Sequence, residues 1–212
     1  MYNRFKLLIY ASAFLFLTLF ILGCGPKVLI PPEVDLIKYG PVGLVTFKST
    51  AKGKLADYIT LKFLDEISGS QKGIKIVELG DEKKVLNSVD RQTMDPNVIQ
   101  MLGKKYNLKS IITGDLNVSD IKPKVNISSI ITSMSVKAEV QATLIVRLIE
   151  TKDGATIWTN LAEDRRSVAS VSIFSKNDIM FDAQNPDDAY GDLAQFLVKA
   201  VTEDLKPRKR RM

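Results

Sequence analysis

The longest unbroken pattern in this chain is an alternation of apolar and largely polar residues over positions 136–148. Ile145 is the single apolar residue on the polar set of positions; the other set is wholly apolar, comprising Val136, Ala138, Val140, Ala142, Leu144, Val146 and Leu148. A repeat of two is the period of a β-strand that buries one face. Turn residues at 152–154 and an apolar run at 156–161 follow. The pattern therefore predicts a long antiparallel hairpin with one face in the core.

Shorter patterns place other elements around this hairpin. Apolar and β-branched runs bounded by turn residues predict strands at 42–47, 74–79 and 110–118. Apolar residues three and four apart predict helices at 54–68, 95–106 and 186–205, and a shorter helix is expected at 81–89. Asp81 and Asp95 are the expected N-caps, while positions 122–133 fit either a loop or a strand extension. This order predicts an α+β fold, an α/β sandwich in which helices pack on a mixed sheet.

Three single residues in these elements carry structural expectations. Gly114, inside a predicted strand, indicates a bend or close packing on the sheet. Trp158, directly after the hairpin turn, is expected to anchor the core or the sheet edge. Tyr106 is expected to pack at the end of its helix.

The first 23 residues have the organisation of a secretory signal. Arg4 and Lys6 precede an apolar stretch at positions 7–22, and Gly23 then precedes Cys24, the only cysteine. The stretch has 16 residues, short of the roughly 17 to 25 that a spanning helix needs, which disfavours the alternative of an uncleaved membrane anchor. We therefore expect residues 1–23 to be a cleaved signal.

The cleavage-site residues Ile21, Leu22 and Gly23 with Cys24 resemble the bacterial lipobox. This resemblance implies that signal peptidase II cuts before Cys24 and that its thiol carries diacylglycerol, with acyl chains such as palmitate as the only covalent group expected. Two or three acyl chains bind a membrane stably without a spanning helix. No other cofactor and no metal site is expected.

Residues 24–41 are expected to form a proline-containing tether, with residues 28–30 either extended or packed on the body. Residues 42–205 are expected to form a single periplasmic domain, because one core can serve a chain of this length. Once Arg4 and Lys6 are removed with the signal, 28 basic and 24 acidic residues remain. Five of the basic residues lie in a tail at 206–212: Lys206, Arg208, Lys209, Arg210 and Arg211.

The body is therefore nearly neutral, with 23 basic and 24 acidic residues at 24–205. This balance gives no general footprint for nucleic acid. The basic tail either contacts an anionic surface or is a solvated end. The chain has no histidine and shows no paired-carboxylate, phosphate-loop or nucleophile motif, so no catalytic residue is assigned and an enzyme is not expected.

Four segments together resemble a known family: the predicted strand at 42–47, the segment at 101–114, the long predicted strand at 136–148, and the sequence Thr151-Lys152-Asp153-Gly154-Ala155-Thr156-Ile157-Trp158. Over residues 40–205 the chain is similar to periplasmic lipoproteins related to the curli secretion channel and to the lipoprotein activators of penicillin-binding proteins. The resemblance implies an anticodon-binding-like fold acting as a non-catalytic interaction module. In such lipoproteins a residue other than Asp after the lipidated cysteine permits export to the outer membrane, and Gly25 fits this rule.

The resemblance leaves two arrangements open. One is a lipid-anchored domain on the periplasmic face of the outer membrane that binds an unidentified envelope protein, with contacts expected in an exposed hairpin or loop at Ser167, Phe174, Lys176 and Asp178. The alternative is an oligomeric pore subunit like the curli channel. Positions 122–133 and 167–182 are too short and too irregular for the membrane strands that a pore needs, so the sequence favours the tethered domain and leaves the oligomeric state open.

Overall fold

The structure is a computed structural model that describes residues 27–124, 137–169, 171–175 and 178–211. The chain divides into two compact units. The larger unit is Pro32–Lys206, and the smaller combines Met1–Pro31 with Pro207–Met212. Cys24 and the cleavage-site residues lie outside the described residues.

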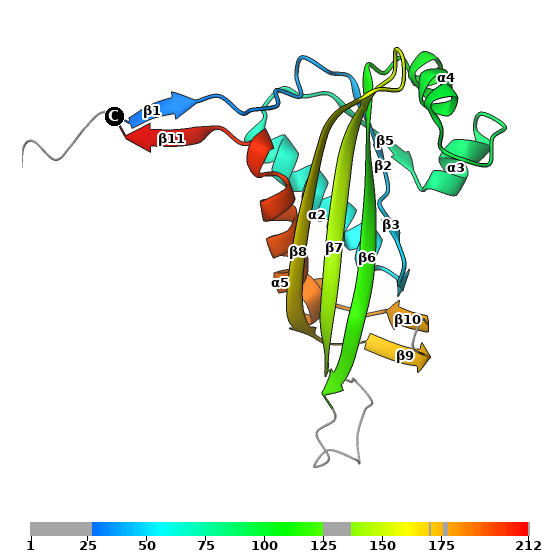
Figure 1. The fold of residues 1–212 in the computed structure, drawn as a ribbon, viewed down its shortest axis with the longest axis vertical. Helices are drawn as coiled ribbons and strands as arrows, with labels where there is room; N and C mark the ends of the chain where they lie inside the picture. The colour runs from blue at the N-terminus through cyan, green and yellow to red at the C-terminus, as the bar shows by residue number, and fades with distance from the viewer. Residues whose placement is uncertain (1–26, 125–136, 170, 176–177, 212) are drawn as a thin grey trace, which may run out of the picture. The chain divides into compact units, whose positions relative to one another are not determined.

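The larger unit is built on a six-stranded mixed sheet (Figure 1). Its strands are β2 (Val42–Val45), β3 (Lys48–Ser49), β5 (Ile76–Gly80), β6 (Ser110–Lys124), β7 (Lys137–Glu150) and β8 (Thr156–Val168). The order is β5-β2-β6-β7-β8, with β3 also paired to β6. The pairs among β5, β2, β3 and β6 are parallel, and β6-β7-β8 are antiparallel. The structure thus confirms the predicted α+β fold with its long hairpin.

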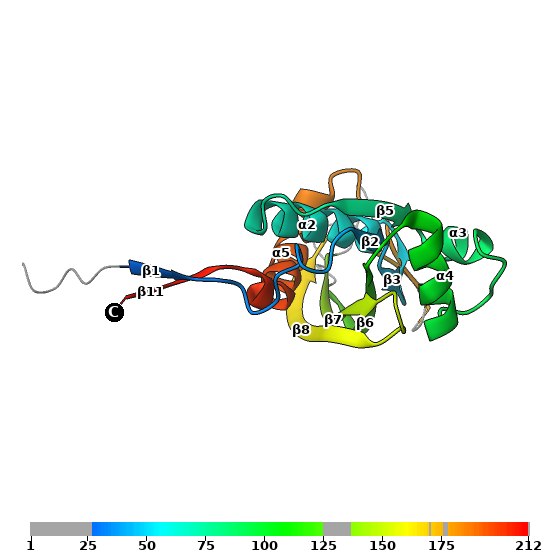
Figure 2. The ribbon, with the colours of Figure 1, turned by 90° about the horizontal axis from the view of Figure 1, so that it is seen from above.

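Helices lie on both faces of this sheet (Figures 1 and 2). On one face are α2 (Leu55–Ser70) and α5 (Pro186–Val201), which is followed by the 3-10 helix η2 (Glu203–Leu205). The other two helices, α3 (Glu82–Asn87) and α4 (Pro96–Tyr106), lie beside β2 and β5. Each described helix is too short or too polar to cross a bilayer.

The alternation in β7 produces the main core. Six of its apolar side chains are fully buried: Ala138, Val140, Ala142, Leu144, Val146 and Leu148. They share a cluster with Ile59 and Phe63 of α2 and with Leu193 and Leu197 of α5. Burial of each Val, Leu, Ile or Phe side chain in this cluster contributes about 1.5–3 kcal/mol, so packing of α2 and α5 on β7 is a main source of the stability of this unit.

A second core cluster attaches α3 and α4. Val85 of α3 and Ile99 of α4 pack with Val45 of β2 and Ile111 of β6. The four residues of β2 are all buried, as expected for a parallel strand covered on both faces.

Local capping confirms both predicted helix starts. An Asp81 carboxylate oxygen accepts a 2.8 Å hydrogen bond from the Lys84 amide, and Asp95 accepts one of 2.8 Å from the Val98 amide. These bonds satisfy amides that have no partner within the helix. Tyr106 differs from the prediction, since it is 36% exposed rather than packed. Asn107 ends α4 in the left-handed conformation, and the tyrosine ring lies beside the Lys105 ammonium.

The predicted packing of Gly114 and Trp158 is confirmed. A Cβ atom on Gly114 would lie 2.4 Å from the Phe47 ring, so β6 needs glycine there to accept that ring. Trp158 is 9% exposed and belongs to the main core. Its indole nitrogen donates to Asp204 at 3.3 Å.

Several elements end at different places from those predicted. β8 continues to Val168 because its register with β7 persists, pairing Ser167 with Glu139. The final α-helix is interrupted at Tyr190, where φ is −146°, and ends at Val201. β6 extends to Lys124, and the rest of the undecided stretch at 122–133 lies outside the described residues.

A small three-stranded sheet contains the predicted hairpin or loop near position 175. It comprises β4 (Lys52–Gly53), β9 (Val171–Ser175) and β10 (Asp178–Phe181), in the order β4-β10-β9. Val171 and Phe181 at the base of this hairpin are buried, whereas the sequence indicated an exposed segment. Phe181 is buried because it packs against Tyr190, with ring centroids 5.7 Å apart.

The segment before β2 is attached to the larger unit. Leu36 is fully buried, and the Val34 amide donates to the Asp204 carbonyl oxygen at 3.2 Å. Val34 and Leu36 both fall within residues 24–41, which the sequence predicts to be the tether. In the smaller unit, β1 (Lys27–Ile30) pairs antiparallel with β11 (Arg208–Arg211).

Candidate interaction surface

Beyond the end of β6 and β7 where Ile111 and Ile149 pack beside α4, the three long strands have one face that no described helix covers. The core-facing residues of β7 alternate with half-exposed residues on its other side, and Figure 2 shows α2 and α5 together on the core side of β6, β7 and β8. We call the opposite side of these three strands the open sheet face. An open face of three paired strands is a rigid platform, because backbone hydrogen bonds hold each side chain in register.

An apolar pair lies near the middle of the open sheet face. Ile145 of β7 is registered directly opposite Leu161 of β8 on one side and Asp115 of β6 on the other. Leu161 is 55% exposed, and Ile145 is half-buried beside it. Opposite residues in antiparallel strands have neighbouring side chains, so the pair forms a small apolar centre.

On one side of this centre is an ion pair. Arg147 contacts Asp115 at 2.7 Å across β6 and β7, and both side chains are nearly half exposed. Exposed pairs of this kind contribute only about 0–1 kcal/mol to stability. Their effect here is to orient two charged side chains next to Ile145.

On the other side is a polar network between β7 and β8. Arg165 donates to the Gln141 side-chain oxygen at 2.5 Å and lies 3.9 Å from Glu139. The Gln141 amide nitrogen in turn donates to Glu163. An apolar centre with a polar rim is the usual anatomy of a protein–protein interface, and this is the chemistry that the open sheet face can support.

Part of this surface can be recognised in the sequence. Ile145 stands out as the apolar exception in the alternation, but the strand predicted after the turn ends at Leu161. Only the register of β8 on β7 shows that the two residues are adjacent.

Of the four residues predicted to contact a partner, Ser167 alone has a side chain that the structure describes. Ser167 is exposed near the end of β8. Phe174 lies in β9 and Asp178 in β10, but their side chains and the whole of Lys176 lie outside the described set. These residues therefore remain sequence-based predictions.

The basic tail divides between the two units. Lys206 belongs to the larger unit, where its ammonium contacts Glu66 of α2 at 2.7 Å. Arg208, Lys209, Arg210 and Arg211 form β11 of the smaller unit.

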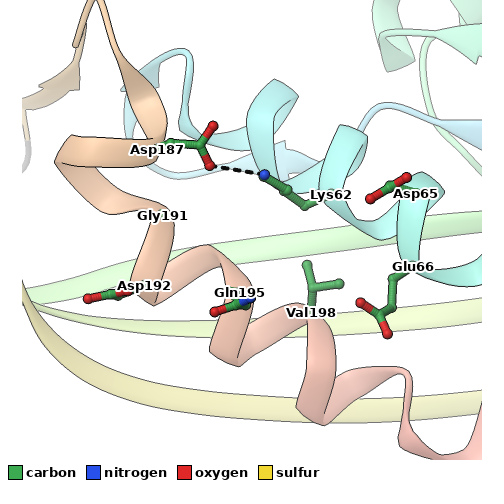
Figure 3. Close-up of a pocket in the computed structure, with 8 residues that line it drawn as sticks. All are labelled: Lys62, Asp65, Glu66, Asp187, Gly191, Asp192, Gln195 and Val198. Carbon is green, nitrogen blue, oxygen red and sulfur yellow. Dashed lines mark ion pairs between the residues drawn. The ribbon is translucent and has the colours of Figure 1, made fainter.

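A polar groove of about 240 Å³ lies between α2 and α5 (Figure 3). Its lining includes the carboxylates of Asp65, Glu66, Asp187 and Asp192 together with Lys62. The Lys62 ammonium contacts Asp187 at 3.0 Å. Among the described residues, no three acidic, histidine or cysteine side chains lie close enough together to hold a metal ion.

The electrostatics of the groove come from one triad. The Tyr58 hydroxyl donates to Asp187, and this bond, with the one from Lys62, holds the pKa of Asp187 below its usual value. The bond to Asp187 raises the pKa of Lys62. Burial, followed by the same carboxylate, raises the pKa of Tyr58. The Lys62 ammonium and the Asp187 carboxylate neutralise each other. The triad thus connects α2 to the start of α5, and the lysine charge is already paired.

Comparison with known proteins gives structural likenesses alone. No protein-family profile matches the chain, and no curated protein sequence matches it. The PelC dodecamer from Paraburkholderia phytofirmans is 14% identical with a TM-score of 0.45, over 87% of this chain and 99% of that chain. A hypothetical protein from Chlamydia trachomatis is 13% identical with a TM-score of 0.45, over 76% and 92% of the two chains.

A lipoprotein from Neisseria meningitidis is 10% identical with a TM-score of 0.37, over 59% of this chain and 82% of that chain. A bacterial lipoprotein is thus among the structures that this chain is similar to. At TM-scores below 0.5 these likenesses do not show a function for this chain.

Proposed function

We propose that this chain is a lipid-anchored protein of the bacterial envelope whose α+β domain binds another envelope protein through the open sheet face. In this proposal Cys24 carries the acyl chains, the domain faces the periplasm, and Gly25 directs the anchor to the outer membrane. The domain acts as a non-catalytic interaction module in envelope assembly or secretion. This role agrees with the family that the sequence resembles.

The observation that supports binding is the exposure of Leu161 beside Ile145 on a rigid face. Leu161 is 55% exposed, and its strand is hydrogen-bonded to β7 over twelve registered pairs from Ala138 to Ile149. A single exposed leucine needs no explanation by itself. A leucine next to an isoleucine, inside a polar rim on a hydrogen-bonded sheet, gives a partner a desolvated contact with fixed neighbours.

The charges of the rim favour a protein as the partner over a polyanion. Around its apolar centre the open sheet face carries Asp115 and Glu163 against Arg147 and Arg165, and the contacts described above join these residues across strands. Further along β7, Glu139 is registered opposite Lys122, and Lys137 lies two residues away on the same side. A polyanion is bound by a surplus of cations. The apolar centre has no such surplus around it, so its recognition would come from shape and from apolar contact.

The anchor is tested first in a Gram-negative host. We expect the N-terminal peptide of the mature chain to begin at Cys24 with the mass of attached acyl chains, and the protein to fractionate with the outer membrane. Cys24→Ser should keep its first 23 residues and lose the outer-membrane fraction. A mature chain that begins elsewhere, or a Cys24 peptide without acyl mass, would contradict the anchor.

The interaction is tested by photocrosslinking in the same cells. A photoreactive residue at position 161 should give one discrete crosslinked band. The same residue at Leu61 of α2, which is 60% exposed, serves as the matched control and should give none. Mass spectrometry of the band identifies the partner, and an equal pattern at both positions would overturn the assignment of the open sheet face.

The size of the crosslinked product also separates the two arrangements that the sequence leaves open. Adducts with a different envelope protein support the interaction module. A ladder of multiples of this chain's own mass would favour the oligomeric channel subunit instead.

A further inference from the structure

The smaller unit is a two-stranded ribbon with a distinctive composition. β1 has the sequence Lys-Val-Leu-Ile and β11 the sequence Arg-Lys-Arg-Arg. Val28 and Ile30 are each 38% exposed, and Leu29 is 61% exposed. Arg208, Lys209 and Arg210 are exposed as well. An apolar strand is therefore paired with a cationic strand, and both are open to their surroundings.

The register places an apolar residue against each of three cations. Val28 is opposite Arg210, Leu29 is opposite Lys209, and Ile30 is opposite Arg208. Opposite side chains in an antiparallel pair lie on the same face, while successive residues alternate between faces. Both faces of the ribbon thus combine apolar surface with positive charge.

Such a ribbon is expected to have little stability of its own when only water surrounds it. An isolated two-stranded hairpin is marginally stable at best, and like charges at adjacent positions of β11 repel one another. Anions beside β11 would remove this repulsion, and an apolar phase beside β1 would cover Leu29. An anionic lipid surface offers both, since headgroup phosphates lie next to acyl chains.

Chain connectivity limits the distance between the ribbon and the proposed anchor. Lys27, the first residue of β1, follows Cys24 by three positions. Three residues span at most about 11 Å, which is close to the Debye length of about 8 Å at physiological salt. If Cys24 is acylated, the start of the ribbon therefore stays within about one to two Debye lengths of the leaflet that holds the acyl chains.

We propose that the β1–β11 ribbon is a second membrane contact, in which Lys209 and Arg210 bind the phosphates of anionic phospholipids and Leu29 inserts among the headgroups of the same leaflet. This inference rests on the proposed acylation of Cys24. The antiparallel pairing of β11 with β1 brings the basic strand to the anchor, so that Cys24 and β11 would attach to one membrane patch.

The test uses the mature acylated protein, purified in detergent and reconstituted into vesicles. Leu29→Cys introduces a thiol for an environment-sensitive fluorophore, and an acylated Cys24 cannot react with the same reagent. Vesicles contain phosphatidylcholine alone or with phosphatidylglycerol, together with a small share of nitroxide-labelled lipid as quencher. We expect strong quenching with phosphatidylglycerol at low salt, and weak quenching with phosphatidylcholine alone or at high salt.

Charge variants separate a local contact from a general effect of net charge. Each cation near an anionic surface contributes about fivefold to the contact equilibrium, so Lys209→Gln with Arg210→Gln should shift it about 25-fold and bring quenching toward the phosphatidylcholine level. The matched control is Lys104→Gln with Lys109→Gln, which removes the same charge from two exposed lysines of the larger unit. The control should leave quenching unchanged.

The outcomes distinguish this inference from the proposed anchor. A second fluorophore on Cys24 would show that the anchor is absent. With Cys24 blocked, equal quenching in both kinds of vesicle would overturn the ribbon contact and leave the anchor intact. Equal effects of the two charge pairs would also overturn it, because the contact would then not belong to β11.

Discussion

The side-chain amide nitrogen of Gln71 donates a 2.8 Å hydrogen bond to the carbonyl oxygen of Leu205, 134 positions further along the chain. The same nitrogen donates to the Val34 carbonyl at 2.8 Å, and the Gln71 side-chain oxygen accepts from the Leu36 amide at 2.7 Å. Gln71 is 5% exposed. One buried amide directly after α2 therefore joins the segment before β2 to the end of the last helix.

Replacing this amide should destabilise the larger unit. Gln71→Leu leaves a buried amide hydrogen and two buried carbonyls without their partner, and each unsatisfied group costs about 1–3 kcal/mol. Because some of these groups gain water after relaxation, we expect a total loss of about 3 kcal/mol in the free energy of unfolding. Urea denaturation followed by the fluorescence of Trp158, the only tryptophan, measures it.

The matched control is Gln195→Leu on the exposed side of α5, which should change stability by less than about 0.5 kcal/mol. Equal stabilities of the two variants would show that the three hydrogen bonds of Gln71 are not structurally important.

The role of Gln71 shows where sequence reasoning stops. Strands and helices with a regular period, such as β7 and α2, are predictable because local spacing decides which face is buried. The caps at Asp81 and Asp95 are predictable for the same reason. The bonds of Gln71 depend on segments that meet only in the folded chain, and a glutamine after a helix resembles any surface residue.

Each candidate surface likewise has residues that the sequence indicates and a long-range pairing that only the folded chain shows. Ile145 breaks the alternation and can be found in the sequence, whereas its adjacency to Leu161 requires the register of β8. The basic residues at 208–211 are obvious in the composition. Their pairing with β1, next to the proposed anchor, is a long-range register that no local pattern encodes.

A second prediction concerns the close approach of β6 to the core. Gly114→Ala would place a Cβ atom 2.4 Å from the ring of Phe47, and that ring packs edge-on against Phe63 with centroids 5.2 Å apart. Overpacking of this kind costs about 1–3 kcal/mol. We expect a lower unfolding midpoint in urea with an unchanged slope.

Gly69→Ala provides the opposite case with the same chemical change. Nothing lies within 4 Å of the added Cβ atom at this position of α2, and alanine is favoured over glycine in a helix by up to about 1 kcal/mol. The midpoint should rise slightly. A fall of similar size in both variants would contradict the steric explanation at Gly114.

A third prediction separates binding from folding on the open sheet face. Leu161→Lys places a charge at the apolar centre without creating a cavity, because the side chain is mostly exposed. We expect stability within about 0.5 kcal/mol of the wild type and a loss of at least about tenfold in the crosslinking yield from a photoreactive residue at the exposed Thr159. Leu61→Lys on α2 should change neither quantity.

The fourth prediction rests on a buried hydroxyl. Tyr190 is 2% exposed, and its hydroxyl oxygen has no hydrogen-bond partner among the described residues. Its ring is held by Tyr58, at a centroid distance of 5.5 Å, and by Phe181. Tyr190→Phe keeps this ring packing and removes an unsatisfied polar group, so stability at neutral pH should stay the same or rise by about 1 kcal/mol.

The same hydroxyl makes stability depend on alkaline pH. Burial raises the pKa of Tyr190 from 10.0 to about 12 in the folded protein. Between these values the unfolded chain releases the phenol proton while the folded chain keeps it, so the unfolded state binds fewer protons and stability falls as the pH rises. The stability that the neutral Tyr190 phenol contributes is complete below pH 10 and is lost as the pH approaches about 12.

Urea denaturation of the wild type and of Tyr190→Phe, at neutral pH and again near pH 11, measures this contribution as the difference between the two proteins. The wild type should lose stability relative to the variant at up to about 1.4 kcal/mol per pH unit above pH 10. Tyr106→Phe, which alters an exposed tyrosine, should follow the wild-type curve. Parallel curves for the wild type and Tyr190→Phe would mean that the Tyr190 hydroxyl reaches solvent in the folded state.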